Sequence, residues 1–151
     1  MNPLVTNEVL GILAFQATLA CMPDRRIELP NALLILPLIF NKRIRSILKN
    51  KKVVYISSRD LVLSFPREFS AVGNQFLDLS VTSLNTMLLA CEMGIAEFDE
   101  KTLSLHSEIF TSTNSKSVGQ LGAEIFLAAP RLAKILEENG TELYQNFRIV
   151  L

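Results

Sequence analysis

A chain of 151 residues has the usual length of one domain and is long enough to bury a substantial core. Its 15 basic and 15 acidic residues cancel, so the protein as a whole carries no field that would draw it to nucleic acid. Hydrophobic residues make up 49% of the chain and the mean hydropathy is +0.31, which is high for a small domain and favours apolar surface that contacts a partner.

Charge is unevenly distributed along the chain. Residues 29–59 contain no Asp or Glu but seven cations: Lys42, Arg43, Arg45, Lys49, Lys51, Lys52 and Arg59. The acidic residues are concentrated later, within residues 92–108 and 137–142. This bipolar pattern favours contacts with unlike partners or self-assembly.

The first predicted element is a helix over residues 3–21. Asn2 supplies a cap residue and Pro3 occupies the first helical position, while Pro23 stops the pattern. The N-terminus has no basic segment and carries Glu8 among its apolar residues, which argues against a signal peptide.

Two predicted helices follow a polar connector at residues 23–31. Pro30 begins the first, whose apolar run at residues 32–40 is too short for a membrane span of about 20 residues. Pro37 is predicted to end or kink this helix, because an interior proline removes one hydrogen bond and crowds the preceding turn. Asn41 then caps a basic helix. The inward face of that helix is predicted to consist of Ile44, Ile47 and Leu48.

The middle of the chain is predicted to hold a short strand, a short helix and a long helix. Residues 53–57, VVYIS, are β-branched and aromatic, which predicts a strand or an extended segment. Ser58 begins a helix that ends before Pro66. Residues 71–93 are predicted to form one long, mostly buried helix, with an interruption near Ser80 as the alternative.

A β-hairpin is predicted directly after the long helix. Gly94 is placed to cap that helix, and residues 95–107 form two alternating segments around a polar turn. A helix followed by glycine and a short hairpin is the wing portion of many winged-helix domains. The same pattern also occurs in other folds.

The C-terminal part is predicted to contain a flexible loop and a last helix. Residues 111–117 are small and polar, and a helix with a kink at Pro130 follows over residues 118–138. The tail is predicted to be a short helix and strand. The fold class is therefore mainly α with a small β-hairpin (α+β), a winged-helix-like single domain over residues 1–151.

No motif for catalysis, metal binding or cofactor binding is present. The chain lacks a Walker A loop, a Gly-rich dinucleotide fingerprint, an HExxH helix and a nucleophile elbow. His106 is predicted to be a half-exposed strand residue, and the pairs Asp99-Glu100 and Glu137-Glu138 are predicted to be solvated. Cys21 and Cys91 lie among apolar neighbours and are predicted to be small buried side chains in a reducing, cytoplasmic protein.

The basic segment is the main candidate site. Its cations Lys42, Arg43, Arg45, Lys49, Lys51 and Lys52 are candidate contacts for a protein partner or for phosphate. Lys42 and Arg45 are the preferred pair, because an arginine can make two parallel hydrogen bonds to a carboxylate or phosphate. The alternative is that both pair locally and cap helix ends.

These residues carry a resemblance to the middle-component family of three-component ABC systems. That family is typified by an Asn separated by seven residues from a Phe, a proline-introduced apolar run and a motif close to L-P-L-x-x-H-K-x-x-R. The matching residues are Asn7, Phe15, Pro30, Leu36, Pro37, Leu38, Lys42 and Arg45. Asn41 stands where the family has histidine. Looser similarity extends through the long helix and the last helix.

The resemblance implies a bacterial defence protein encoded between an effector and an SMC-like or Rad50-like ABC ATPase, as in Lamassu-type systems. It further implies a non-catalytic adaptor that links the ATPase to the effector, often a nuclease. From the missing motifs and the short apolar run we expect no cofactor and no membrane contact; DNA contact through the complex stays open. A winged-helix DNA-binding regulator is the alternative function, and an enzyme built from converging acids is a third.

Overall fold

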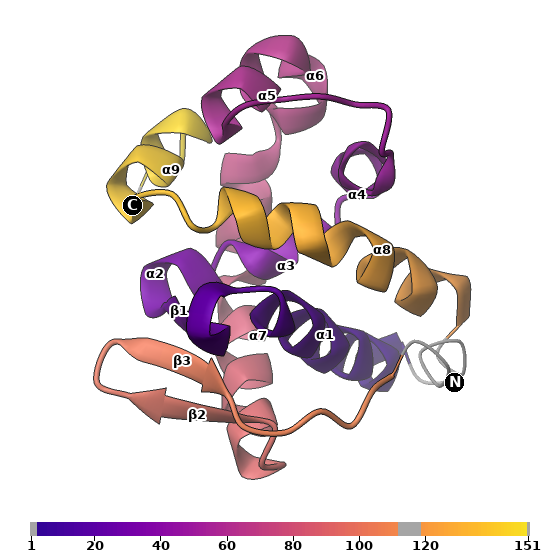
Figure 1. The fold of residues 1–151 in the computed structure, drawn as a ribbon, viewed down its shortest axis with the longest axis vertical. Coiled ribbons are helices and arrows are strands. Elements are labelled where there is room, and N and C mark those ends of the chain that lie inside the picture. The colour runs from indigo at the N-terminus through magenta and orange to yellow at the C-terminus, as the bar shows by residue number, and fades with distance from the viewer. Residues whose placement is uncertain (1–2, 112–118, 151) are drawn as a thin grey trace.

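The computed structural model describes residues 3–111 and 119–150. In these ranges the chain forms helices and one small sheet (Figure 1). The elements in chain order are α1 (Pro3–Ala20), η1 (Pro23–Arg25), β1 (Arg26–Glu28), α2 (Leu29–Ala32), α3 (Ile35–Ile39), α4 (Lys42–Lys49), α5 (Ser58–Ser64), α6 (Pro66–Phe69), α7 (Val72–Glu92), β2 (Ala96–Asp99), β3 (Thr102–Leu105), α8 (Gly119–Ile135) and α9 (Gly140–Asn146). The predicted α+β class is confirmed.

The helices are arranged around α1 and α3. Figure 1 shows α7 running lengthwise behind α1 and α3, while α8 crosses in front. Contacts join α1 to α7 and α8, and α4 to α8. The small helices α5, α6 and α9 lie toward one end of the molecule and the sheet toward the other (Figure 1). One continuous apolar core joins these elements.

The sheet has three antiparallel strands in the order β1-β3-β2. The predicted hairpin is confirmed as β2 and β3, and Gly94 ends α7 with a φ of 76°. Strand β1 lies in the segment that was predicted to be a polar connector. It contributes one buried residue, Ile27, which pairs with the buried Leu103. A single inward side chain leaves too little alternation for the sequence to indicate a strand.

Pro37 does not divide the apolar run as predicted. Helix α3 passes through Pro37, which is the third residue of the helix and therefore lies in the first turn, where backbone N–H groups have no partner within the helix. The boundary with the basic helix falls instead at Asn41. There the Asn41 Oδ1 accepts hydrogen bonds from the backbone N–H groups of Arg43 and Ile44, at 3.0 and 3.1 Å, so the predicted cap is confirmed.

Other predicted elements are partly changed. Residues 53–57 form no strand, and neither does the tail at residues 147–150. Helix α7 is continuous through Ser80, but it is not mostly buried. Cys21 is exposed rather than buried, and Cys91 is half-buried. Residues 112–117 of the predicted loop lie outside the described residues. No helix in the described ranges is long and apolar enough to span a membrane.

Candidate partner-binding surfaces

Arg45, one of the two preferred contacts, is buried within the chain. Its side chain is 8% exposed, and its Nε donates to the Glu124 Oε1 of α8 at 3.1 Å. Its Nη1 donates to the backbone oxygen of Ile39 at 2.9 Å. Lys49 Nζ lies 3.6 Å from the same Glu124 oxygen. These contacts hold α4 against α3 and α8, as the local-pairing alternative expects for Arg45.

The charge of Glu124 is stabilised by these cations. The hydrogen bond from Arg45 lowers the pKa of the Glu124 carboxyl from its ordinary value of 4.5, with burial opposing the shift and Lys49 adding to it. Glu124 therefore stays ionised at neutral pH, and its negative charge compensates the buried positive charge of Arg45.

Four other predicted cations are exposed. Lys42 and Arg43 border a hollow of about 600 Å³ between α4 and α6, which Phe65 and Glu68 also line. Lys51 and Lys52 lie in the turn that follows α4. The structure therefore leaves these four side chains accessible to a partner. The motif residues Leu36, Pro37 and Leu38 are all buried in α3.

Arg131 of α8 holds the segment that follows α4. Its guanidinium donates to the backbone oxygens of Asn50 and Val53 and lies 4.5 Å from the centre of the Tyr55 ring. Burial raises the pKa of Tyr55, and the positive charge of Arg131 opposes that shift. At the other end of the segment, Asp60 accepts a hydrogen bond from the Ile56 N–H at 2.9 Å. The segment is thus anchored at both ends.

The exposed face of α7 is apolar. Leu77, Val81, Leu84 and Leu88 are 55, 67, 51 and 54% exposed. Their spacing of four, three and four residues places them along one helix face, as in the seam of a coiled coil. We call these four residues the α7 stripe. The opposite face, which includes Phe76 and Met87, is buried in the core.

The charged residues of α7 itself are all acidic. Helix α7 contains no Lys or Arg, and its two acids, Asp78 and Glu92, are both exposed. Met93, 48% exposed, extends the apolar surface beyond the end of the helix. A contiguous exposed apolar surface with a polar rim is typical of a protein-binding site. The sequence did not distinguish this face, because α7 is apolar on several sides and periodicity alone indicated burial.

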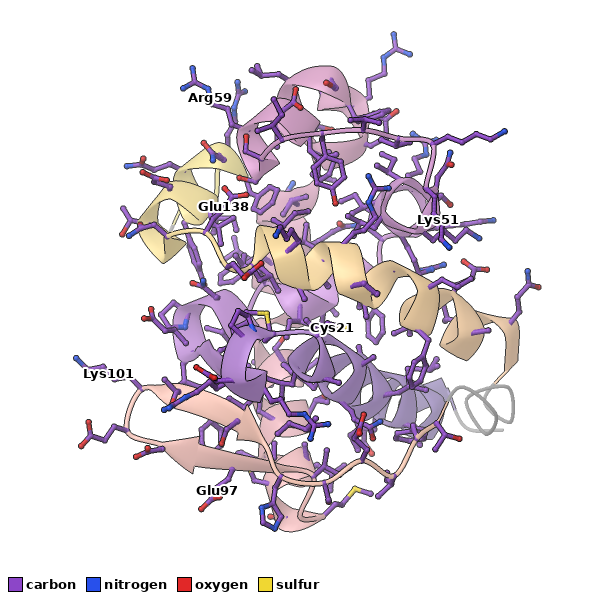
Figure 2. The ribbon with its side chains drawn as sticks, viewed as in Figure 1. Cys21, Lys51, Arg59, Glu97, Lys101 and Glu138 are labelled. Atoms are coloured by element: carbon purple, nitrogen blue, oxygen red, sulfur yellow. The ribbon has the colours of Figure 1, made fainter. Side chains whose placement is uncertain are left out.

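The residues considered for catalysis are dispersed. His106 is exposed and follows β3, while Asp99 and Glu100 are exposed at the hairpin turn. Glu138 lies near the end of α8 (Figure 2) and accepts hydrogen bonds from Ser58 N and Oγ at 2.9 and 2.7 Å, which caps α5 rather than leaving Glu138 solvated. Among the described residues, no three His, Cys, Asp or Glu side chains gather into a possible metal site.

A further hollow of about 650 Å³ lies between α2, α7 and α9. Leu33, Phe76 and Tyr144 contribute to its walls. The Tyr144 hydroxyl donates to the backbone oxygen of Pro30 at 2.6 Å, and burial raises the pKa of Tyr144 to about 12. This hydroxyl therefore serves to join α9 to α2 and stays protonated at neutral pH.

The fold and these surfaces define a mainly helical component with a small sheet and an exposed apolar helix face. The chain belongs to the family described as ABC-three component (ABC-3C) system Middle Component 3, which matches residues 1–151. The resemblance seen in the sequence is confirmed. Comparisons with curated proteins and with solved structures found no match.

Proposed function

We propose that this middle component is a non-catalytic adaptor in a cytoplasmic anti-phage or anti-plasmid defence complex of the Lamassu type. It links an SMC-like or Rad50-like ABC ATPase to an effector, most simply a nuclease. Family membership supports a role beside other components. The single structural observation that carries the proposal is the α7 stripe, because four large apolar side chains at helical spacing lie half-exposed on one face.

The stripe is suited to a partner helix. Covering the exposed halves of its four side chains contributes about 3 to 6 kcal/mol before the costs of association. The spacing fits a helix packed along α7, and the acids Asp78 and Glu92 favour a partner with basic flanks. An adaptor that binds two conformations of the ATPase with different affinity transmits the change to the effector.

Co-purification with the two neighbouring components tests the proposal. We expect the wild-type chain to recover the ABC ATPase at low salt, and the double variant Val81→Glu with Leu84→Glu to lose it. Leu63→Glu is the matched control, because Leu63 is an apolar residue of α5 that is 71% exposed. Recovery by the double variant at the wild-type level, or no recovery by the wild type, would contradict the adaptor function.

A winged-helix DNA-binding regulator is the second candidate. The exposed Lys42, Arg43, Lys51 and Lys52 favour it, as does the order of α7, Gly94 and the hairpin. The absence of any cation on α7 weighs against DNA recognition by that helix.

A mobility-shift assay at several salt concentrations distinguishes this candidate. A regulator shifts duplex DNA with an affinity that falls steeply with salt, and Lys42→Glu with Arg43→Glu abolishes the shift. Arg43 is the suitable partner for Lys42 in this variant, since a change at Arg45 would also disturb the buried pair. No shift by the isolated chain at low salt excludes the regulator.

A further inference from the structure

Residues 53–57 favour a β-strand but have no strand beside them. Val53 and Tyr55 are partly buried and pack against the core, whereas Val54 and Ile56 are 87 and 94% exposed. Alternation with a period of two is typical of an extended chain. Figure 1 shows this stretch crossing from α4 to α5 without pairing to a strand. β-Branched side chains this exposed are suited to packing on a neighbouring strand.

The backbone of this segment is partly unpaired. The oxygen of Val53 accepts from Arg131, and the N–H of Ile56 donates to Asp60. Within the described part of the chain, the backbone groups of Val54 and Tyr55 make no hydrogen bond. Unpaired backbone groups on an extended segment are a template for a further strand. The anchors at both ends lower the ordering cost of accepting one.

The exposed charges that flank the segment in sequence are positive, while the one acid that acts on Tyr55 from another element, Glu138, is bound to Ser58. Lys51 and Lys52 precede it and Arg59 follows it, and all three side chains are exposed. Figure 2 shows Lys51 and Arg59 toward opposite ends of the stretch. The nearest acid in sequence, Asp60, is occupied by the Ile56 N–H.

We propose that residues 53–56 bind an acidic, extended segment of a partner protein as an added β-strand. Backbone hydrogen bonds supply affinity in this mode, and side chains at alternate positions supply specificity. The positive flanks select acidic residues in the partner segment. The choice of a different protein as the partner rests on the proposed adaptor function, and the acidic, extended segment is the part of that partner that binds here.

A second copy of the chain is a poorer occupant. Antiparallel pairing of two such segments places the Lys51 and Lys52 end of one copy beside the Arg59 end of the other. Like charges placed opposite each other disfavour that pairing. The segment lies between α4 and α5, whereas the α7 stripe lies on α7, which passes behind α1 and α3 (Figure 1). An adaptor with both surfaces holds two partner segments at once.

Nuclear magnetic resonance on the isotope-labelled full chain tests the site with synthetic probes. The probe is a heptapeptide of alternating glutamate and valine, and the control replaces each glutamate by lysine. We expect the glutamate peptide to shift the amide signals of Val54 and Tyr55 and to bind at least about tenfold more tightly. Hydrogen exchange should slow at Val54, because successive backbone groups of a strand point to opposite edges and the edge shared by Val53 and Tyr55 already contacts Asn50 and Arg131. No shift at these amides, or equal binding of both peptides, overturns the proposal.

Two variants at Val54 separate strand addition from charge attraction alone. Val54→Pro removes the backbone donor at a position that is 87% exposed and makes no internal backbone bond, so the fold is retained, as circular dichroism will show. Val54→Thr keeps the donor. We expect the proline variant to lose about tenfold or more in peptide affinity and the threonine variant to bind as wild type; equal binding by the two variants overturns strand addition.

The same experiments separate this inference from the adaptor function. Val81→Glu with Leu84→Glu is expected to leave peptide binding unchanged. Peptide binding without recovery of the ATPase contradicts the adaptor function alone, and recovery without peptide binding contradicts the strand site alone. A concentration-dependent dimer that Val54→Pro abolishes assigns the segment to a second copy and overturns the acidic partner.

Discussion

The Arg45 guanidinium and the Glu124 carboxylate meet at 3.1 Å between α4 and α8, and both side chains are largely shielded from water. Burying either charge alone is costly, because removing one partner leaves the other charge without compensation. The pair therefore makes the docking of α4 on α8 depend on both residues. This dependence gives the first two predictions.

Replacing Arg45 by alanine is expected to lower the free energy of unfolding by about 2 to 3 kcal/mol, below the usual cost of breaking a buried pair because Lys49 stays beside Glu124. Urea unfolding measures the change. Arg43→Ala is the matched control on the same helix, and its exposed side chain predicts a change within about 0.5 kcal/mol. Equal effects of the two substitutions would show that the pair does not hold α4.

The stability supplied by Glu124 is expected to depend on pH. Its pKa is lowered in the folded chain, so between the folded and unfolded values the unfolded state binds more protons and stability rises with pH. The contribution is complete above the ordinary value of 4.5 and is lost as pH falls through the lowered pKa. The difference in unfolding free energy between wild type and Glu124→Gln should therefore shrink on acidification; a constant difference contradicts the assignment.

Gly11→Ala is expected to destabilise the contact between α1 and α7. A Cβ at Gly11 would lie 2.9 Å from Thr86 Cγ2, which is closer than carbon atoms tolerate. Overpacking of this kind costs about 1 to 3 kcal/mol, and the better helix propensity of alanine offsets at most about 1 kcal/mol. Thermal unfolding should show a lower midpoint, and adding Thr86→Ser, which removes that methyl group, should restore most of it.

Glu138→Ala is expected to lower the unfolding free energy by about 1 to 2 kcal/mol, because it leaves the Ser58 N–H at the start of α5 without its acceptor. Glu137→Ala is the adjacent control, since Glu137 is exposed. Denaturant unfolding of both variants measures the two losses in unfolding free energy. A larger loss for Glu137→Ala would reverse the roles assigned to these two acids.

The start of a helix such as α4 and the family of the protein could be predicted from the sequence. Asn41 caps α4, and Ile44 lies inward, as its spacing indicated. Such signals are local: a cap acts on backbone groups two or three residues away, and apolar periodicity is a property of one helix. The motif at residues 36–45 likewise needed no partner in space to indicate the family.

Tertiary structure alone decided which side chains are available to a partner. Arg43 and Arg45 belong to one basic helix, but only Arg45 meets Glu124, a residue 79 positions away. Leu84 and Met87 are both apolar residues of α7, yet the core covers only Met87. Residues 53–57 have strong β propensity, but a strand requires a neighbouring strand, which the described chain does not place there. Burial and pairing are properties of contacts between distant segments, whereas the local pattern determines only which surfaces each element has to offer.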